Sequence, residues 1–417
     1  MKKSFKALKN ICSVLIVLSM VFSLSACKSD KKEKSEKQKK LNIFLDTTDV
    51  YSSNVIKFLI DDFKKNNPDV EVKLNDVLGS KSDIMETINL GTEIDVIFTN
   101  RNTLIELSKK GVLSDLQSIY EKEVIGDRYY DVMGSYGRIG DKYYGIGVLP
   151  YSIELLYNKA NLEKLKIPKP TNLEEWLNVL KQINGKGIKT PVVLTEDVDV
   201  NGFLFSLIAS KIINNHDIEE NYDSGEKSYK KVKGMQEIFN QFNSLIKDKG
   251  IAKNSFELGN EQSINSFNNG DSPLLACISY YNSKLNGSNI GIIGNYDNNS
   301  NYGSNVPIII NSLLSIPLNA KNGDNANEFI KYIYSDEVQA RIVQKGIISG
   351  NKIANNKVSG IGKIMVQHIY KANDNSVLIL YNFPDKIKNN VLLAMRRILD
   401  GVYSHKEWEE ILKESYK

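Results

Sequence analysis

The chain has 417 residues, of which 41% are hydrophobic and 25% are charged, as in folded globular proteins. Its net charge of +4 comes from the N-terminal segment, because residues 1–40 hold 11 Lys and 3 acidic residues. The rest of the chain holds 43 basic and 47 acidic residues, a net charge of −4. The composition therefore gives no support to nucleic-acid binding, and the three cysteines, of which only Cys277 lies beyond residue 40, exclude a disulfide framework.

Residues 1–26 predict a signal peptide. Lysines near the start precede an apolar run over residues 11–24, which suits a secretory signal and is too short for a transmembrane helix. The tetrapeptide Leu24-Ser25-Ala26-Cys27 resembles the lipobox of bacterial lipoproteins, which implies cleavage before Cys27 and its diacylation; an ordinary signal peptide cut after Ala26 is the alternative. The lysine-rich tract that follows cannot bury enough apolar surface to fold, so we expect residues 27–40 to be a lipidated tether.

Residues 41–111 predict a regular alternation of strands and helices. Apolar alternation and helical spacing place strands at 41–45, 70–74 and 94–99 and helices at 54–65, 84–90 and 102–110. This order is typical of a parallel, doubly wound α/β layer, in which ligands bind beside the carboxyl ends of the strands. Here those ends are Asp46-Thr47-Thr48 and Thr99-Asn100-Arg101.

The pattern changes beyond Gly145. Residues 146–157 form an extended apolar run, and Thr171 with Glu174 predicts a capping box that opens a mostly helical region up to about residue 269. Strands are expected at 274–279, 290–293 and 308–316, and helices at 324–334, 338–344, 390–399 and 406–416. The roughly 375 residues beyond the tether predict two domains.

Most common catalytic motifs are absent from the sequence. There is no GxxxxGK[ST] phosphate loop, no GxSxG elbow and no HExxH, so we expect no catalytic residue, cofactor or metal. The stretch from Asp197 to Gly202 begins like a calcium loop, but Ile208 stands where the twelfth-position Glu should be, so a loop leading into a helix is favoured. Cys277, Trp176 and Trp408 lie in apolar or amphipathic segments and are expected to pack in the core.

Several stretches are similar to bacterial extracellular solute-binding proteins, the family that contains the maltose-binding protein. The most specific pair is GIGVLPYSIELLYNK with TNLEEW. FNNG with LLACISYY, SIPLNAKNGDNANEFIKYIYSDEVQ and VLLAMRRILDGVYSHKEWEEIL follow in the family's order, so the likeness covers nearly all of residues 41–412.

The resemblance implies a type II periplasmic-binding-protein-like fold, in which two doubly wound α/β lobes are joined by crossover strands and close on a solute like a hinge. Lobe 1 would comprise 41–149 plus 308–350, and lobe 2 would comprise 150–307 plus 351–417. The crossovers are expected near 149–153, 307–313 and 347–353.

The resemblance also implies a function. We expect a monomeric, lipid-anchored receptor on the extracytoplasmic face of the cell membrane, which captures a carbohydrate or similar small polar solute and delivers it to the permease subunits of an ABC importer. One alternative is a receptor that reports solute to a membrane signalling partner. The other is an enzyme on the same fold that uses Cys277 or a cleft carboxylate such as Asp46.

Site residues follow where the motifs align. Tyr280 stands where sugar-binding members place a stacking tryptophan, and Tyr151 matches a position that points into the cleft. Two other tryptophans of the family are replaced by polar residues, which favours a small polar ligand, and Arg101 could pair with an anionic group on it. The expected ligand contacts are Asp46, Thr47, Thr48, Asn100, Arg101, Asn102, Tyr151, Ser279, Tyr280 and Asn311.

Overall fold

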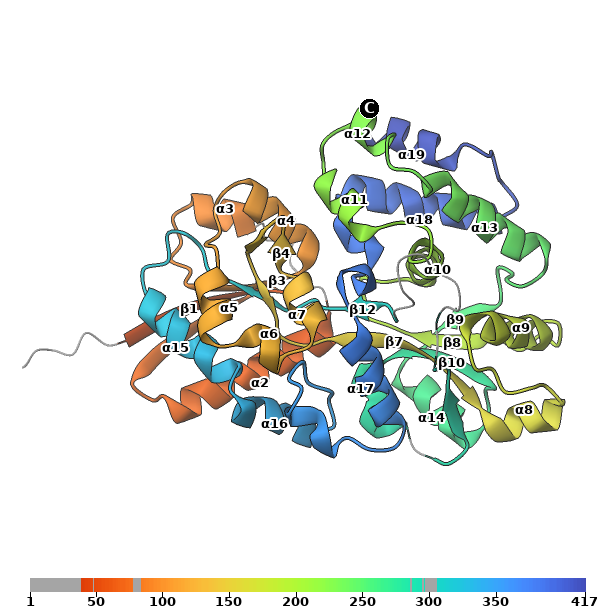
Figure 1. Cartoon of the computed structure of the whole chain (residues 1–417), viewed down its shortest axis with the longest axis horizontal. Coiled ribbons are helices and arrows are strands. Elements are labelled where there is room, and N and C mark those ends of the chain that lie inside the picture. Colours follow the sequence, from red (N-terminus) through yellow and green to blue (C-terminus); the bar gives the residue numbers. More distant parts are fainter. Residues whose placement is uncertain (1–38, 48, 78–83, 286, 295, 297–305) are drawn as a thin grey trace, which may run out of the picture.

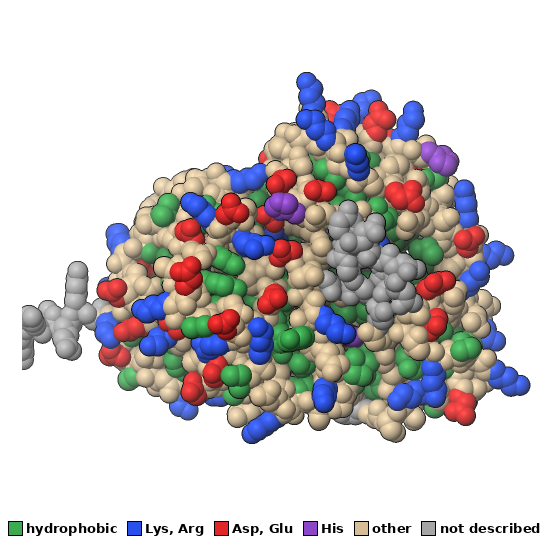
Figure 2. All heavy atoms as spheres, in the orientation of Figure 1, with side chains coloured by type: hydrophobic (Ala, Val, Ile, Leu, Met, Phe, Trp, Pro, Cys, Tyr) green, Lys and Arg blue, Asp and Glu red, His purple; other side chains and the backbone are tan. Residues whose placement is uncertain are grey.

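Two α/β lobes, each built on its own sheet, make up the part of the chain that the computed structural model describes: residues 39–47, 49–77, 84–285, 287–294, 296 and 306–417 (Figure 1). The predicted signal peptide, Cys27, most of the tether and Thr48 lie outside these residues. The predicted two-lobed fold is confirmed. Positive and negative side chains are interspersed over the face drawn in Figure 2.

The first sheet has the strand order β2-β1-β3-β13-β6. The predicted parallel layer is confirmed, because β2 and β3 both pair with β1 in parallel, and β13 then joins β3 in the antiparallel direction. The strands are β1 (Lys39–Asp46), β2 (Val70–Asp76), β3 (Val96–Thr99), β6 (Ile146–Gly147) and β13 (Leu313–Ser315).

Helices and a small hairpin surround the first sheet. Helix α2 begins at Val50, earlier than predicted, because the Asp49 carboxylate accepts a hydrogen bond from the backbone N–H of Ser52 and caps the first turn. The helices are α2 (Val50–Asn66), α3 (Ile84–Asn89), α4 (Arg101–Lys109), α5 (Gln117–Lys122), α6 (Ile125–Arg128), α7 (Asp131–Ser135), α15 (Gly323–Ile333) and α16 (Asp336–Gln344), and the hairpin is β4 (Arg138–Ile139) with β5 (Lys142–Tyr143).

The second sheet has the strand order β11-β7-β10-β8-β9, with β12 also paired to β7. β8 and β9 fall in the region predicted to be mostly helical; at four and three residues they are too short to show an alternating pattern. The strands are β7 (Tyr151–Asn158), β8 (Thr190–Val193), β9 (Phe256–Leu258), β10 (Leu274–Ile278), β11 (Ile290–Ile292) and β12 (Ile308–Ile309).

The helices of the second lobe pack around this sheet and above it (Figure 1). Trp176 and Trp408 are buried as predicted, and each indole N–H donates to a backbone carbonyl. The helices are α8 (Lys159–Leu165), α9 (Leu173–Asn184), α10 (Val200–Ala209), α11 (Asn215–Glu220), α12 (Glu226–Tyr229), α13 (Met235–Lys247), α14 (Glu261–Asn269), α17 (Ile361–Lys371), α18 (Asp385–Leu399) and α19 (Glu407–Ser415), with 3-10 turns η1 (Ser279–Lys284), η2 (Ala354–Lys357), η3 (Asp374–Ser376) and η4 (Ile379–Asn382).

One capping prediction was wrong by a residue. Asn172, not Thr171, caps α9, because its side-chain oxygen accepts from the N–H of Glu175. Thr171 instead donates through its backbone N–H and its hydroxyl to the carboxylate of Glu175, so Glu175 bonds the residue before the cap and not the backbone N–H of the cap itself.

Within the residues that the structure describes, the chain passes between the two sheets at three places. The predicted strand 308–316 is split, because β12 pairs with the second sheet and β13 with the first, so residues 310–312 cross between the lobes. Residues 148–150 cross between β6 and β7, and the N–H of Val148 donates to the carbonyl of Ser312 on the neighbouring crossing segment (3.0 Å). The third passage lies between α16 and α17; residues 347–353 form one isolated bridge there, from Asn351 to Tyr129, rather than a strand.

None of the helices that the structure describes combines the length and the hydropathy that crossing a bilayer requires.

Candidate functional site

Polar side chains from both lobes meet between the two sheets. Asp49 follows β1 in the first lobe, and Asp197 follows β8 in the second. Asn311, on the crossing segment between β12 and β13, donates from Nδ2 to Asp197 Oδ1 (3.0 Å) and also faces Asp49. The hydroxyl of Tyr381, in η4, donates to Asp197 Oδ2 (2.5 Å). Segments that are far apart in the sequence therefore converge on one hydrogen-bonded group.

Asp49 is a buried carboxylate with one unused oxygen. Its Oδ1 accepts from the N–H of Ser52 (2.7 Å), whereas no described donor reaches its Oδ2 with hydrogen-bond geometry, although the side chains of Asn311 and Ser52 lie near enough to lower the pKa of the carboxyl. Burial away from water and, to a smaller extent, the nearby Asp197 carboxylate raise the pKa of Asp49 to about 6 against the opposing effect of hydrogen bonds from Ser52 and Asn311. Because folded proteins leave few buried polar atoms unpaired, an open carboxylate oxygen between the lobes makes this place the candidate ligand site.

Other buried polar atoms near Asp49 also lack a partner among the described residues: Ser52 Oγ, Tyr151 Oη and Asn311 Oδ1. The Tyr151 hydroxyl lies close to Ser52 and Asp49, and burial raises its pKa well above the usual value, so it stays protonated and able to donate. The interface between the lobes thus holds both donors and acceptors of the kind that a polar ligand can use.

Tyrosine rings form one wall of the site. The ring centroids of Tyr51 and Tyr280 are 4.8 Å apart, and those of Tyr151 and Tyr280 are 5.9 Å apart. The hydroxyl of Tyr51 hydrogen-bonds that of Tyr281 (2.8 Å), which links α2 in the first lobe to η1 in the second. We call the whole group the cleft cluster; it comprises Asp49, Tyr51, Tyr151, Asp197, Tyr280, Asn311 and Tyr381.

Of the predicted site residues, the structure places Tyr151, Tyr280 and Asn311 in the cleft cluster. Thr47 and Ser279 support it: the Thr47 hydroxyl donates to the carbonyl of Asp49 (3.4 Å), and Ser279 Oγ accepts from the N–H of Ser152 (3.0 Å). Asp46 is half-buried at the end of β1. Direct ligand contact by any of these residues stays a prediction.

Arg101 contacts protein groups rather than facing open space. It is 1% exposed; Nε donates to Asn382 Oδ1 (2.6 Å), Nη1 to the carbonyl of Tyr136 (2.5 Å), and Nη2 to the carboxylate of Glu219. Since Arg101 lies in the first lobe and Glu219 and Asn382 in the second, its guanidinium joins the lobes.

Neighbouring residues of α4 extend the same contact. Asn102 donates from Nδ2 to the carbonyl of Phe383, and Lys109 donates to the carbonyl of Tyr222. Asn100 caps α4 by accepting from the N–H of Thr103 (3.0 Å). We call the contacts of Arg101, Asn102 and Lys109 with the second lobe the α4 latch; in Figure 1, α4 and α11 face each other across the two lobes.

Sequence reasoning missed Asp49, Tyr51, Asp197 and Tyr381. Asp197 belongs to the stretch that resembled a calcium loop, and the structure explains that pattern differently. Asp199 caps α10, with Oδ1 accepting from the N–H of Gly202 (2.8 Å), which confirms the expected loop into a helix. The one available signal for Asp49 was its position directly after the expected contacts at the end of β1.

Cys277 is buried in β10, as predicted. Burial raises the pKa of its thiol well above the usual value, and the nearby Glu154 carboxylate adds to the effect. The thiolate is the reactive form of cysteine, so the structure gives no support to Cys277 as a nucleophile.

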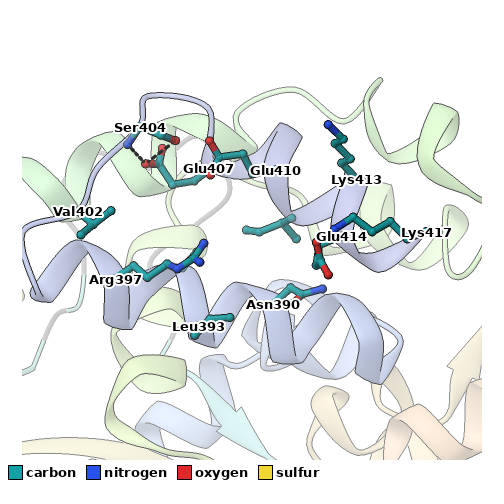
Figure 3. Close-up of a pocket in the computed structure, with 12 residues that line it drawn as sticks. Asn390, Leu393, Arg397, Val402, Ser404, Glu407, Glu410, Lys413, Glu414 and Lys417 are labelled. Atoms are coloured by element: carbon teal, nitrogen blue, oxygen red, sulfur yellow. Dashed lines mark hydrogen bonds and ion pairs between the residues drawn. The ribbon is translucent and has the colours of Figure 1, made fainter.

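A surface hollow lies elsewhere, between α18 and α19 (Figure 3). It measures about 540 Å³, and basic side chains such as Arg397 and Lys413 alternate along it with acidic ones such as Glu410 and Glu414. Glu407 there is engaged by Ser404, whose N–H donates to its carboxylate (2.5 Å). None of the unpartnered buried atoms found among the described residues lines this hollow, so it lacks the feature that marks the cleft cluster.

Asp49→Asn is expected to stabilise the protein at neutral pH. The folded-state pKa of Asp49, about 6, is above the ordinary 3.8, so the native state holds a proton that the unfolded state has lost between those values, and native stability falls as the pH rises through them. The charge then costs about 2–3 kcal/mol near neutrality, and Asn removes this cost while keeping the cap on α2.

Urea unfolding at about pH 4 and about pH 7.5 measures this effect, and the gain should appear only at the higher pH. Asp199→Asn, the same change at a partly exposed helix cap, is the control and should alter stability by less than about 0.5 kcal/mol. An equal gain at both pH values for Asp49→Asn would contradict the explanation.

The chain was compared with known families, curated proteins and solved structures. A family model described as bacterial extracellular solute-binding protein matches residues 50–340. No curated protein sequence matches. Solved structures with a similar fold include the sugar-binding protein MalE from Xanthomonas citri (TM-score 0.66, 16% identity, covering 90% of this chain and 95% of that one).

Two further structures have the same fold. A family 1 extracellular solute-binding protein from Bifidobacterium longum subsp. infantis aligns with a TM-score of 0.66 and 18% identity over 91% of this chain and 99% of that one. The binding protein RafE in complex with raffinose aligns with a TM-score of 0.64 and 18% identity over 90% of this chain and 98% of that one.

Proposed function

Because the chain belongs to the bacterial extracellular solute-binding protein family, we propose that it is a lipid-anchored receptor that captures a carbohydrate or similar small polar solute between its lobes and delivers it to the permease of an ABC importer. The observation that carries the proposal is the cleft cluster, where the buried oxygens of Asp49, Tyr151 and Asn311 lack partners among the described residues beside a wall of tyrosine rings. The raffinose bound by one solved neighbour supports a sugar as the solute.

The chemistry of the cleft suits a polyol. Hydroxyl groups of a sugar are both donors and acceptors, which matches the open acceptors on Asp49 and Asn311 and the open donor on Tyr151. The less polar face of a sugar ring packs against aromatic rings, which Tyr51 and Tyr280 offer. A solute that touches both lobes binds the closed form more tightly than an open one, so binding favours closure.

The N-terminal segment of the chain would attach the receptor to the membrane. Two acyl chains on Cys27 would anchor the protein firmly, since each buried methylene contributes about 0.8 kcal/mol. The lysine-rich tract before β1 would then act as a tether that keeps the lobes close to a permease while leaving them free to rotate.

A thermal-shift screen of the chain from residue 28 onward tests the proposal. The panel contains neutral sugars, amino sugars, sugar acids, sugar phosphates, amino acids and peptides. A solute at about a hundred times its dissociation constant should add about 2.7 kcal/mol of stability. Stabilisation by amino acids or peptides and not by any sugar would contradict a carbohydrate receptor.

Tyr280→Ala is expected to weaken binding of a stabilising sugar by at least about tenfold, or about 1.4 kcal/mol, because it removes the ring that faces Tyr51 and Tyr151. Isothermal titration calorimetry measures the change. Tyr370→Ala, at a tyrosine that is 64% exposed and outside the cleft cluster, serves as the control and should bind normally. Equal affinity in the Tyr280→Ala and Tyr370→Ala proteins would exclude Tyr280 from the site.

A further inference from the structure

The cleft cluster carries negative charge contributed by both lobes. Asp49 is fully buried, and Asp197 is partly buried beside it. Glu196, next to Asp197, accepts from the N–H of Val50 at the start of α2 (3.3 Å), which brings a third carboxylate to the edge of the same group. Asp49 Oδ2 remains without a donor among the described residues.

Two of the cations near this group are paired with other carboxylates. Arg101 is paired with Glu219 in the α4 latch, and Lys284 is paired with Glu261. The ammonium group of Lys388 lies 5.7 Å from the centre of the Tyr381 ring, and no ion pair joins it to a carboxylate within the described part of the chain. The protein therefore supplies polar partners to Asp49, but no described cation pairs with it.

A buried carboxylate is costly unless a cation or several donors compensate it. A neutral hydroxyl would give Asp49 Oδ2 a hydrogen bond but would leave the charge uncompensated. An ammonium group would provide the donor and the opposite charge together. It would also be attracted by the faces of tyrosine rings, and Tyr51, Tyr151 and Tyr280 stand beside Asp49.

We propose that the solute is an amino sugar, and that Asp49 binds its protonated primary amine while the tyrosines of the cleft cluster pack against the ring. This rests on the proposed function and narrows its solute class. It also reverses the expectation that Arg101 binds an anionic group, because the guanidinium of Arg101 is already paired.

The test is calorimetric titration of the chain from residue 28 onward with matched sugars at neutral pH. The probes are glucosamine, galactosamine, mannosamine and the glucosamine dimer, each beside its hydroxyl and its N-acetyl counterpart, together with glucuronate. At least one amine should bind ten times or more tighter than both of its counterparts, and glucuronate should bind most weakly. Counterparts that bind as tightly as every amine would overturn this inference and leave the proposed function standing; no binding by any sugar would count against both.

Asp49→Asn separates charge from hydrogen bonding, because Asn keeps the side-chain oxygen that caps α2. It should reduce affinity for the amine at least tenfold and change affinity for the N-acetyl form less than twofold. Glu196→Gln, at an exposed carboxylate on the edge of the cluster, is the matched control and should reduce amine affinity less than threefold. Equal losses for amine and N-acetyl forms in Asp49→Asn would overturn the assignment, and thermal unfolding verifies that each variant is folded.

Discussion

Replacing Arg101 by alanine is expected to open the two lobes and to lower the free energy of unfolding by about 3–5 kcal/mol. The guanidinium of Arg101 is buried and bonded to Glu219 and Asn382 of the second lobe, and the N–H of Gly140 in the first lobe donates to the other oxygen of Glu219 (3.1 Å). Without Arg101, Glu219 would remain at the interface with a single donor. Opening hydrates that carboxylate, so loss of stability and opening are coupled.

Two measurements check this prediction. Small-angle X-ray scattering without solute should give a larger radius of gyration for Arg101→Ala than for the unmodified chain, and urea unfolding gives the loss of stability. The matched control is Arg138→Ala, which removes another ion pair between the lobes, Arg138 with Asp374, whose side chains are 43% and 56% exposed. Exposed pairs contribute up to about 1 kcal/mol, so the control should stay closed. Equal opening in both variants would contradict a central role for the α4 latch.

Opening should also weaken solute binding. If the closed form binds the solute and becomes a minor population, the apparent dissociation constant rises in inverse proportion to that population. Arg101→Ala would then bind more weakly although Arg101 itself contacts protein groups. A variant that is open by scattering yet binds with unchanged affinity would show that closure and binding are not linked in this protein.

The second large effect is expected in the core of the second lobe, where Glu154 and His368 form a buried pair. Glu154, in β7, is fully buried; its Oε2 lies 2.9 Å from His368 Nδ1, and its Oε1 accepts from the hydroxyl of Ser152. His368→Ala leaves the buried carboxylate with one hydroxyl partner and removes the partner of its other oxygen. The free energy of unfolding should fall by about 3–5 kcal/mol.

A double-mutant cycle measured by urea unfolding isolates this pair. Glu154→Gln removes the charge, so adding His368→Ala to it should cost clearly less than His368→Ala alone, with a coupling of at least about 1 kcal/mol. The control is His216→Ala, which breaks the exposed pair of His216 with Glu220 and should cost less than about 0.5 kcal/mol. Additive losses in the cycle would mean that His368 acts by packing alone.

Local patterns were enough to predict much of the first lobe. The helical spacing of Val55, Ile56, Leu59, Ile60 and Phe63 and the alternation of Val70, Val72 and Leu74 indicated α2 and β2, and all of these side chains belong to the core or pack against it. Such elements bury one face, and that face repeats along the sequence. β8 and β9 have no such signal, because their pairing depends on partners far along the chain.

The candidate site was harder to predict for the same reason. Asp49 and Asp197 come together only when the lobes meet, and no local pattern relates them. The partner of Arg101 shows most clearly what a local sequence pattern cannot reveal. At the carboxyl end of β3 an arginine indicates an anionic ligand, but here Glu219 of α11 supplies the anion from within the protein. Sequence reasoning identified the edge of the sheet correctly as a place where polar groups gather, and it could not tell which of them were already paired.

The division of residues 308–315 between two sheets has a mechanical consequence. β12 is bonded to the second sheet and β13 to the first, so the lobes turn about residues 310–312 and the adjoining segment 148–150. Atoms close to a hinge axis move little when the lobes rotate, whereas atoms far from the axis move farther. Asn311 lies on the crossing segment. Arg101, at the start of α4, lies close to it because Leu313 pairs with Thr99, whereas Lys109, at the other end of α4, lies farther away. A solute bound against Asn311, as proposed above, would therefore shift little as the lobes open, whereas contacts farther from the crossing segments would separate first.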